Sequence, residues 1–151
     1  MHKNHKHSHQ EIAQQAIDLV RPAIDELFKR SIRSELHIVI LDPRLKPWEG
    51  DFDEAILYQE SIKSGAPWEK PFDDFARNKA KQAWRAQRHN LHLQVQHPSS
   101  LKDDDLPFYG AFVYGDLVVA CSGVEQWFDM LVSSWVAMSF EQLMIHQQHQ
   151  A

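Results

Sequence analysis

Hydrophobic positions recur at helical spacing in three long segments of the chain. The first runs from about Ser8 or Gln10 to Arg30, and Ser8 with Glu11 forms a capping-box pattern at its start. The second runs from about Lys70 to His89, where phenylalanines and alanines share one stripe, and the third from about Val124 to His146. Each segment predicts an amphipathic helix that buries one face.

Shorter apolar segments predict five strands. They are Leu36–Leu41, Ala55–Ser61, Leu91–Gln96, Phe108–Tyr114 and Leu117–Cys121. In the third of these, apolar and polar residues alternate with the period of two that a half-buried strand shows, and the last two flank a tight-turn pair, Gly115-Asp116. The predicted fold class is α+β in the order α-β-β-α-β-β-β-α, a five-stranded antiparallel sheet flanked by helices in a profilin- or PAS-like layout.

The pattern predicts one domain, over residues 10–146, between two unstructured ends. Residues 1–9, MHKNHKHSH, contain nothing that could bury a face, so we expect a disordered histidine-rich tail whose binding of metal ions is incidental. Residues 147–151 are expected to fray from the last helix.

Charge and cysteine content exclude several classes of protein. A net charge of -5 gives no electrostatic reason to expect nucleic acid as a partner. The single cysteine, Cys121, excludes an intrachain disulfide and a zinc cluster of thiolates. No apolar run reaches the ~18 residues of a membrane span, and the first residues hold no apolar signal region. We therefore expect a cytoplasmic protein without membrane partners.

Three short motifs carry a resemblance to a known family. They are Lys79-Ala80 followed by Ala83, the segment Pro107–Tyr114, and Ser122-Gly123 followed after five residues by Asp129. With the order of elements, these motifs resemble the haem-degrading-domain superfamily, which includes GlcG-type proteins, the haem-binding protein HbpS and the C-terminal part of PduO. The resemblance covers about residues 10–143. It implies a small ligand-binding protein, with haem or another tetrapyrrole as a ligand, and a homo-oligomer.

Histidines near the end of the second predicted helix are the candidate haem ligands, because a neutral imidazole is a natural axial ligand of haem iron. An arginine there would pair with propionates. The full predicted ligand-binding set is Lys79, Arg85, His89, His92, His97 and Tyr109. The competing interpretation is that the histidines are exposed polar residues of a half-hydrated strand. A metal site is less favoured, since the histidine spacing matches no standard signature.

The sequence assigns no catalytic residue. Ser122 lacks the G-x-S-x-G elbow of hydrolases, and Cys121 lies in a predicted buried strand, where a thiol acts as a small apolar group. Asp129 stands in the first turns of the last predicted helix, where a carboxylate stabilises the positive helix end.

The aromatic content leaves the arrangement of subunits open. Five tryptophans and eight phenylalanines are many for one small domain, and Trp84 and Trp127 could lie either in the core or in a subunit interface. Three functions remain: a ligand-binding protein, a structural or interaction subunit that keeps the fold without a site, and a catalyst whose substrate the sequence does not identify.

Overall fold

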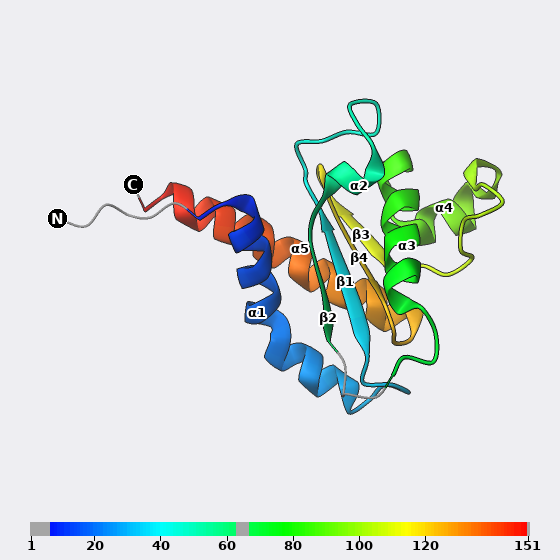
Figure 1. Cartoon of the computed structure of the whole chain (residues 1–151), viewed down its shortest axis with the longest axis horizontal. Coiled ribbons are helices and arrows are strands. Elements are labelled where there is room, and N and C mark those ends of the chain that lie inside the picture. The colour runs from blue at the N-terminus through cyan, green and yellow to red at the C-terminus, as the bar shows by residue number, and fades with distance from the viewer. Residues whose placement is uncertain (1–6, 63–66, 151) are drawn as a thin grey trace.

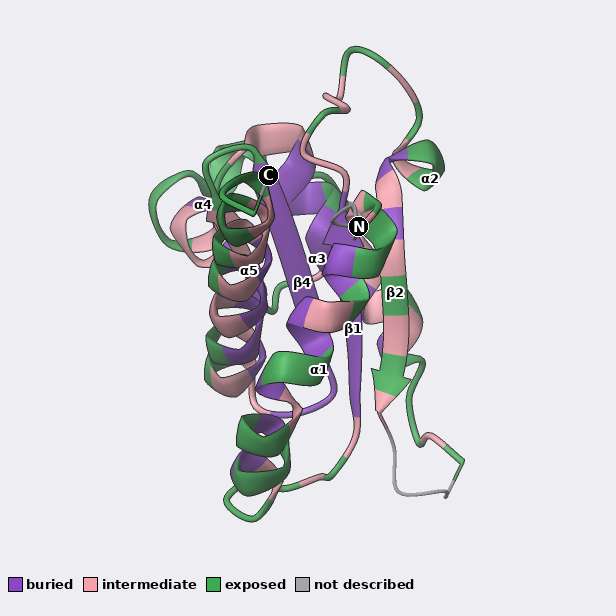
Figure 2. Ribbon diagram, turned by 90° about the vertical axis from the view of Figure 1, so that its left-hand side faces the viewer, coloured by how far each residue is buried: buried purple, intermediate pink, exposed green. Residues whose placement is uncertain are grey.

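A four-stranded antiparallel sheet forms the centre of the computed structural model, which describes residues 7–62 and 67–150 (Figure 1). The strands are β1 (Leu36–Leu41), β2 (Ile56–Ile62), β3 (Ala111–Tyr114) and β4 (Leu117–Ser122), and their order across the sheet is β2-β1-β4-β3. Every residue of the two central strands, β1 and β4, is buried, and both strands are purple along their length in Figure 2. This burial on both faces explains why their sequences are almost entirely apolar, with His37 and Ser122 as the polar exceptions.

Helices cover both faces of the sheet. They are α1 (His9–Phe28), α2 (Phe52–Ala55), α3 (Phe72–Ala86), α4 (Asn90–Gln96), the 3₁₀ turn η1 (Pro98–Ser100) and α5 (Gln126–Gln148). On one face, α1 and α5 pack together over alternate residues of β1 and β4, such as Ile38 and Val119. On the other face, α3 packs over the intervening residues, such as Val39 and Ala120. The core is therefore two layers that share the central strands.

Small residues let α3 lie close to the sheet. Ala76, Ala80 and Ala83 are fully buried and face Val39 and Ala120 of the central strands. Side chains of this size keep the helix axis near the strands, because no long side chain separates them. The predicted alanine stripe is confirmed.

The prediction of a five-stranded sheet is wrong. The segment Leu91–Gln96, expected to be a strand, is part of the helix α4, and the described residues form four strands. Its alternation of apolar and polar residues does not correspond to one buried face, because Leu93 is buried while Val95 is 70% exposed. The predicted order α-β-β-α-β-β-β-α is corrected to α-β-α-β-α-α-β-β-α, with α2 and α4 as the added helices.

Asn90 shows why this segment is helical. It is fully buried at the first position of α4, and its amide nitrogen donates to the Lys79 carbonyl (3.0 Å) and to the Gln82 side chain (3.0 Å). Its Oδ1 accepts from the backbone N–H of Ala111 (2.7 Å), at the start of β3. These bonds hold α4 against α3 and the beginning of β3, in a position where it cannot join the sheet.

The predicted hairpin and the predicted start of the first helix are confirmed. Tyr114 and Leu117 pair across the two-residue turn between β3 and β4. At Ser8, the side chain accepts from the Glu11 N–H while the Glu11 carboxylate accepts from the Ser8 N–H, which completes the capping box. Pro22 lies inside α1 without dividing it.

The two ends of the described chain meet. His9, which the sequence assigned to the tail, is the first residue of α1, and residues 1–6 of that tail lie outside the described residues. The backbone N–H of His7 donates to the Gln147 side chain near the end of α5 (2.6 Å). In the described parts of the chain, no helix combines the length and the apolar character needed to cross a membrane.

Candidate functional site

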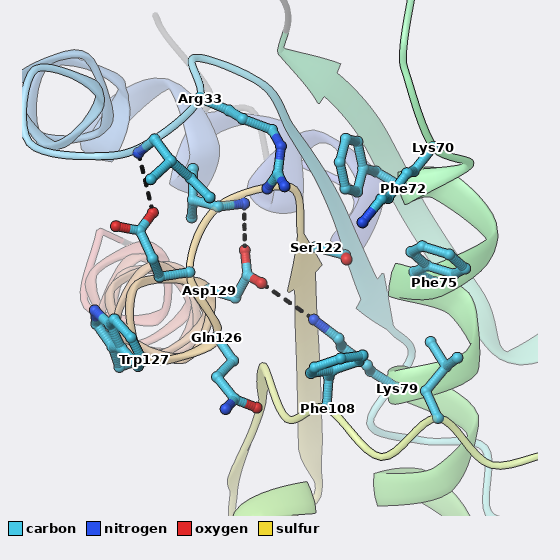
Figure 3. A pocket seen from close by; sticks show the side chains of 14 residues that line it. Arg33, Lys70, Phe72, Phe75, Lys79, Phe108, Ser122, Gln126, Trp127 and Asp129 are labelled. Carbon is cyan, nitrogen blue, oxygen red and sulfur yellow. Dashed lines mark hydrogen bonds and ion pairs between the residues drawn. The ribbon is translucent and has the colours of Figure 1, made fainter.

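A pocket of about 260 Å³ opens between the first half of α3, the segment before β1 and the beginning of α5 (Figure 3). Its walls are largely apolar, and charged groups lie at its base and rim. The lining residues are Ile32, Arg33, Lys70, Phe72, Phe75, Lys79, Leu106, Phe108, Ser122, Val124, Glu125, Gln126, Trp127 and Asp129.

A buried ion pair forms the base of the pocket. Lys79 Nζ of α3 lies 3.1 Å from Asp129 Oδ2 of α5, and the two side chains are only 3% and 2% exposed. The ammonium also donates to the Cys121 carbonyl at 3.2 Å. The other carboxylate oxygen of Asp129 accepts from the Val124 N–H at 3.2 Å. Burying two charges requires this degree of pairing, since an unpaired charge in the interior is costly.

Gly110 makes room for the ion pair. A Cβ at this position would lie 2.5 Å from the Cys121 carbonyl oxygen and 3.0 Å from Lys79 Nζ. The Lys79 ammonium donates to this Cys121 carbonyl, so a larger residue at position 110 would displace the ammonium from its acceptors. The backbone of Gly110 thus approaches the pair closely because it has no side chain.

Burial makes Asp129 unusual among the carboxylates of the protein. Loss of solvation raises its pKa from the usual 3.8 to about 7, even though the charge and hydrogen bond of Lys79 act in the lowering direction. Near neutral pH the carboxyl group therefore exists in both its neutral and its ionised form. A ligand that changes the local charge would shift this balance.

Ser122 brings to the pocket a hydroxyl that has no partner among the described residues. The residue is 4% exposed at the end of β4, and its hydroxyl faces the pocket in Figure 3. No hydrogen bond joins this hydroxyl to any of the described residues. Because this hydroxyl opens on the pocket, it is available to hydrogen-bond a molecule that enters there.

Cationic side chains occupy the rim. Arg33 donates to the Gly123 carbonyl at 3.0 Å, and its guanidinium lies over the Phe72 ring at 5.2 Å from the ring centroid. Lys70 precedes α3 and reaches over the opening in Figure 3. Phe108 and Trp127, each 56% exposed, form the outer wall. The site therefore combines aromatic surface with positive charge.

The structure distributes the predicted ligand-binding residues over several places. Lys79 lies in the pocket. Arg85 forms two hydrogen bonds with the Asp105 carboxylate, at 3.2 and 2.6 Å, and this pairing occupies the guanidinium. Tyr109 precedes β3, and its backbone N–H donates to the side chain of Gln126, a pocket residue.

The three predicted histidines lie outside the pocket. His89 and His92 line a shallow groove of about 240 Å³, and the His92 and His97 rings are 5.2 Å apart. His89 Nδ1 accepts from the Val113 N–H at 2.9 Å, and its ring stacks on Phe112. Burial lowers the pKa of His89, so its ring is neutral at pH 7. Among the described residues, no group of three or more His, Cys, Asp or Glu side chains is placed to hold a metal ion.

Sequence reasoning named Ser122 and Asp129 but gave neither a place in the site, and it did not single out Arg33 or Phe72. One sequence signal did point to Ser122 and Asp129, namely the motifs in which they stand. The motifs that resemble the haem-degrading-domain superfamily include Lys79, Ser122 and Asp129, and in the structure these three residues line one pocket.

Comparison with known proteins supports the fold. A crystal structure of the Ybr137w protein is similar, with a TM-score of 0.61 and 19% sequence identity over 91% of this chain and 81% of the Ybr137w chain. At this identity the similarity shows a shared fold alone. No family model matches the sequence, and no curated protein matches it either.

Proposed function

We propose that this is a cytoplasmic ligand-binding protein of the haem-degrading-domain superfamily, and that its site is the pocket over Lys79 and Asp129. The observation that carries the proposal is the unpartnered Ser122 hydroxyl beside a buried ion pair in a pocket with aromatic walls. Ligand sites in proteins are typically apolar pockets with a few polar groups that converge on one point. Buried groups with shifted pKa values, as at Asp129, also concentrate in such sites.

The size of the pocket restricts the ligand. A cavity of about 150 Å³ holds benzene, so this pocket of about 260 Å³ has room for one ring or a short branched chain with a polar group. Haem does not fit the site. None of the fourteen residues that line it is His, Cys, Met or Tyr, the usual ligands of haem iron. In the groove lined by His89 and His92, His89 Nδ1 accepts a hydrogen bond, so the proton of its neutral ring is on Nε2 and His89 itself has no free lone pair for iron.

Binding of a small neutral aromatic amide tests the proposal. Titration of ¹⁵N-labelled protein with 2-phenylacetamide should give saturable shift changes at Phe108, Val124 and Trp127, because the ring packs against the aromatic wall. Phe108→Ala should weaken this binding about threefold to tenfold, the value of one aromatic contact. Trp48→Ala is the control, since Trp48 is 77% exposed and does not line the pocket. Shifts that do not saturate, or that spread evenly over the surface, would contradict a ligand site here.

A second candidate, an interaction protein, is favoured by the exposed side of α5. Trp127, Leu131, Met138 and Ile145 are 56%, 37%, 43% and 45% exposed. They follow one another at spacings of four and seven residues, which places them on one face of the helix. The opposite face of α5 packs in the core, so apolar side chains lie on two sides of the helix. Such a helix is usually covered by another surface.

Self-association through this face would appear in light scattering. The protein at roughly tens of micromolar should then have a mass at least twice the 17.6 kDa of the chain, and Met138→Glu should reduce it to a single chain. Val95→Glu is the matched control, because it places the same charge at a site 70% exposed on α4. A wild-type protein that is monomeric under these conditions would rule out this candidate without affecting the pocket.

A further inference from the structure

We propose that the pocket selects small organic anions, which place an acidic group against Ser122 and Lys79 and an apolar group against the phenylalanines of the wall. The inference rests on the proposed function, because it names the class of ligand for the same site. It follows from which polar groups of the pocket are already paired and which are free.

Three of the four carboxylate oxygens in the pocket already accept hydrogen bonds from the protein. Glu125 accepts from the Ser31 hydroxyl at 2.6 Å and from the Ile32 N–H at 3.3 Å, and so fixes the segment between α1 and β1. Asp129 accepts from Lys79 and Val124 at its two oxygens. Both contacts of Glu125 fall on Oε1, so among the described residues its Oε2 is the one carboxylate oxygen of the pocket left without a donor.

The donors of the pocket, in contrast, are only partly used. A lysine ammonium has three N–H groups, and Lys79 has two acceptors, Asp129 and the Cys121 carbonyl. Arg33 uses one nitrogen for the Gly123 carbonyl, although a guanidinium carries five N–H donors. The Ser122 hydroxyl is free, as described above. A carboxylate has two oxygens that accept only, so it complements this excess of donors.

The beginning of α5 adds to the positive potential. Val124, Glu125, Gln126 and Trp127 line the pocket, and the Glu125 side chain at the N-cap makes no capping hydrogen bond. The first N–H groups of a helix have no partner inside the helix, and this end of α5 carries partial positive charge. The free Ser122 hydroxyl beside it can donate a further hydrogen bond to an anion bound here.

The aromatic residues define the rest of the ligand. Phe72 and Phe75 project from the first turns of α3, and Phe108 lies across the opening in Figure 3. Phe72 and Phe75 contact each other edge to face, at 6.2 Å between ring centroids. A flat or branched apolar group packs well against such rings, so arylacetates and branched-chain carboxylates are the class of anion that the pocket suits.

Protonation of Asp129 should modulate this binding. The ionisable groups that face the pocket among the described residues are Arg33, Lys70 and Lys79, which are cationic, and Glu125 and Asp129. Of these, Asp129 is the one whose pKa lies near 7. As the pH falls through this value Asp129 becomes neutral, the net charge of the pocket becomes more positive and Lys79 is less strongly held by its partner. Anion affinity should therefore increase from about pH 8 to about pH 6.

Three probes with the same ring and chain length test the inference on the full chain by NMR titration: phenylacetate, 2-phenylacetamide and 2-phenylethylamine. Phenylacetate should bind about tenfold more tightly than the amide, because its hydrogen bonds are charge-assisted, and the amine should bind most weakly. Only phenylacetate should gain affinity as the pH falls. Ser122→Ala and Lys70→Gln should each weaken phenylacetate more than the amide. Lys81→Gln, an exposed residue of α3 outside the pocket, is the matched control.

The outcomes separate this inference from the proposed function. Equal binding of all three probes at the pocket would overturn selection for anions and leave the ligand site in place. Tighter binding of the amine would reverse the sign of the selectivity and would also overturn it. If no probe gives saturable shifts at the pocket residues, the proposed function fails, and the inference fails with it. Spectra of each variant without probe show whether its fold is intact.

Discussion

Replacing Asp129 by alanine should destabilise the protein by about 3–5 kcal/mol, the cost of leaving one member of a buried ion pair without its partner. The substitution leaves the Lys79 ammonium, 3% exposed, with a carbonyl as its remaining acceptor, and it removes the acceptor of the Val124 N–H. A loss of this size is a large share of the 5–15 kcal/mol by which domains are stable. Urea denaturation followed by tryptophan fluorescence measures it.

A double variant distinguishes pairing from packing. Lys79→Met with Asp129→Leu removes both charges, and it should be less destabilised than Asp129→Ala alone, because no charge is then left buried. Asp73→Ala is the surface control. Asp73 pairs with Arg77 on α3, but its side chain is 39% exposed, so the expected loss is about 1 kcal/mol or less. A double variant as unstable as the single variant would show that the side-chain volumes matter and the charges do not.

The pH dependence of stability gives a further check on the same pair. The pKa of Asp129 is raised in the folded protein from 3.8 to about 7, so the folded state binds this proton more tightly than the unfolded state. The extra stability that comes from binding this proton more tightly in the folded state is therefore complete below about pH 4 and is lost as the pH rises to about 7. Wild-type stability should fall over this interval relative to Asp129→Asn, which has no carboxyl to titrate. A constant difference would contradict the raised pKa.

Gly123→Ala should also destabilise the protein by about 3–5 kcal/mol, since it combines backbone strain with overlap in a closely packed region. Gly123 has φ of +148°, a conformation that residues with side chains rarely adopt. An added Cβ would lie 2.2 Å from the Glu35 carbonyl oxygen and 2.9 Å from the Leu36 Cα, at the start of β1. The backbone there cannot move freely, because His37 pairs with Ser122 in the central sheet.

Gly50→Ala is the matched control for this substitution. A Cβ at Gly50 has its nearest neighbours at 3.4 and 3.5 Å, all of them side-chain atoms, so the change should be within about 1 kcal/mol of neutral. Both variants are compared by chemical denaturation under the same conditions. If Gly123→Ala were as stable as Gly50→Ala, the close approach of the turn after β4 to the start of β1 would not be a feature of the folded protein.

The sequence predicted those elements of the fold whose signals lie in neighbouring residues, and it failed where contacts between distant residues decide the structure. The strand β1 is encoded by a run of mostly apolar residues and the helix α3 by a stripe at helical spacing, and both were predicted within a few residues of their observed bounds. The strand expected at Leu91–Gln96 was wrong, because an alternating pattern over so few residues also fits one face of a short helix. The residue that decides between them, Asn90, acts through bonds to residues as distant as Ala111.

In the candidate site, too, the sequence identified individual residues but not the contacts between them. The sequence identified Lys79, Ser122 and Asp129 as separate motif positions, and it explained Asp129 by the charge of the helix end alone. A lysine on the buried alanine stripe of α3 was a sign that a partner must exist, since an unpaired ammonium is not stable there. The identity of that partner, 50 residues further along the chain, was not predictable from spacing. The histidines were grouped by sequence proximity, and the fold placed them outside the pocket.

The sequence by itself therefore determined the α+β class, the central strands, the last helix (α5) and the motif residues, because helical and strand periodicity are properties of neighbouring residues. The tertiary structure decided the number of strands, the place of α4, the pairing of Lys79 with Asp129 and the pocket above that pair. These features depend on contacts between segments that are distant in sequence. Only the packing of α3 and α5 around β4 brings their side chains within hydrogen-bonding distance.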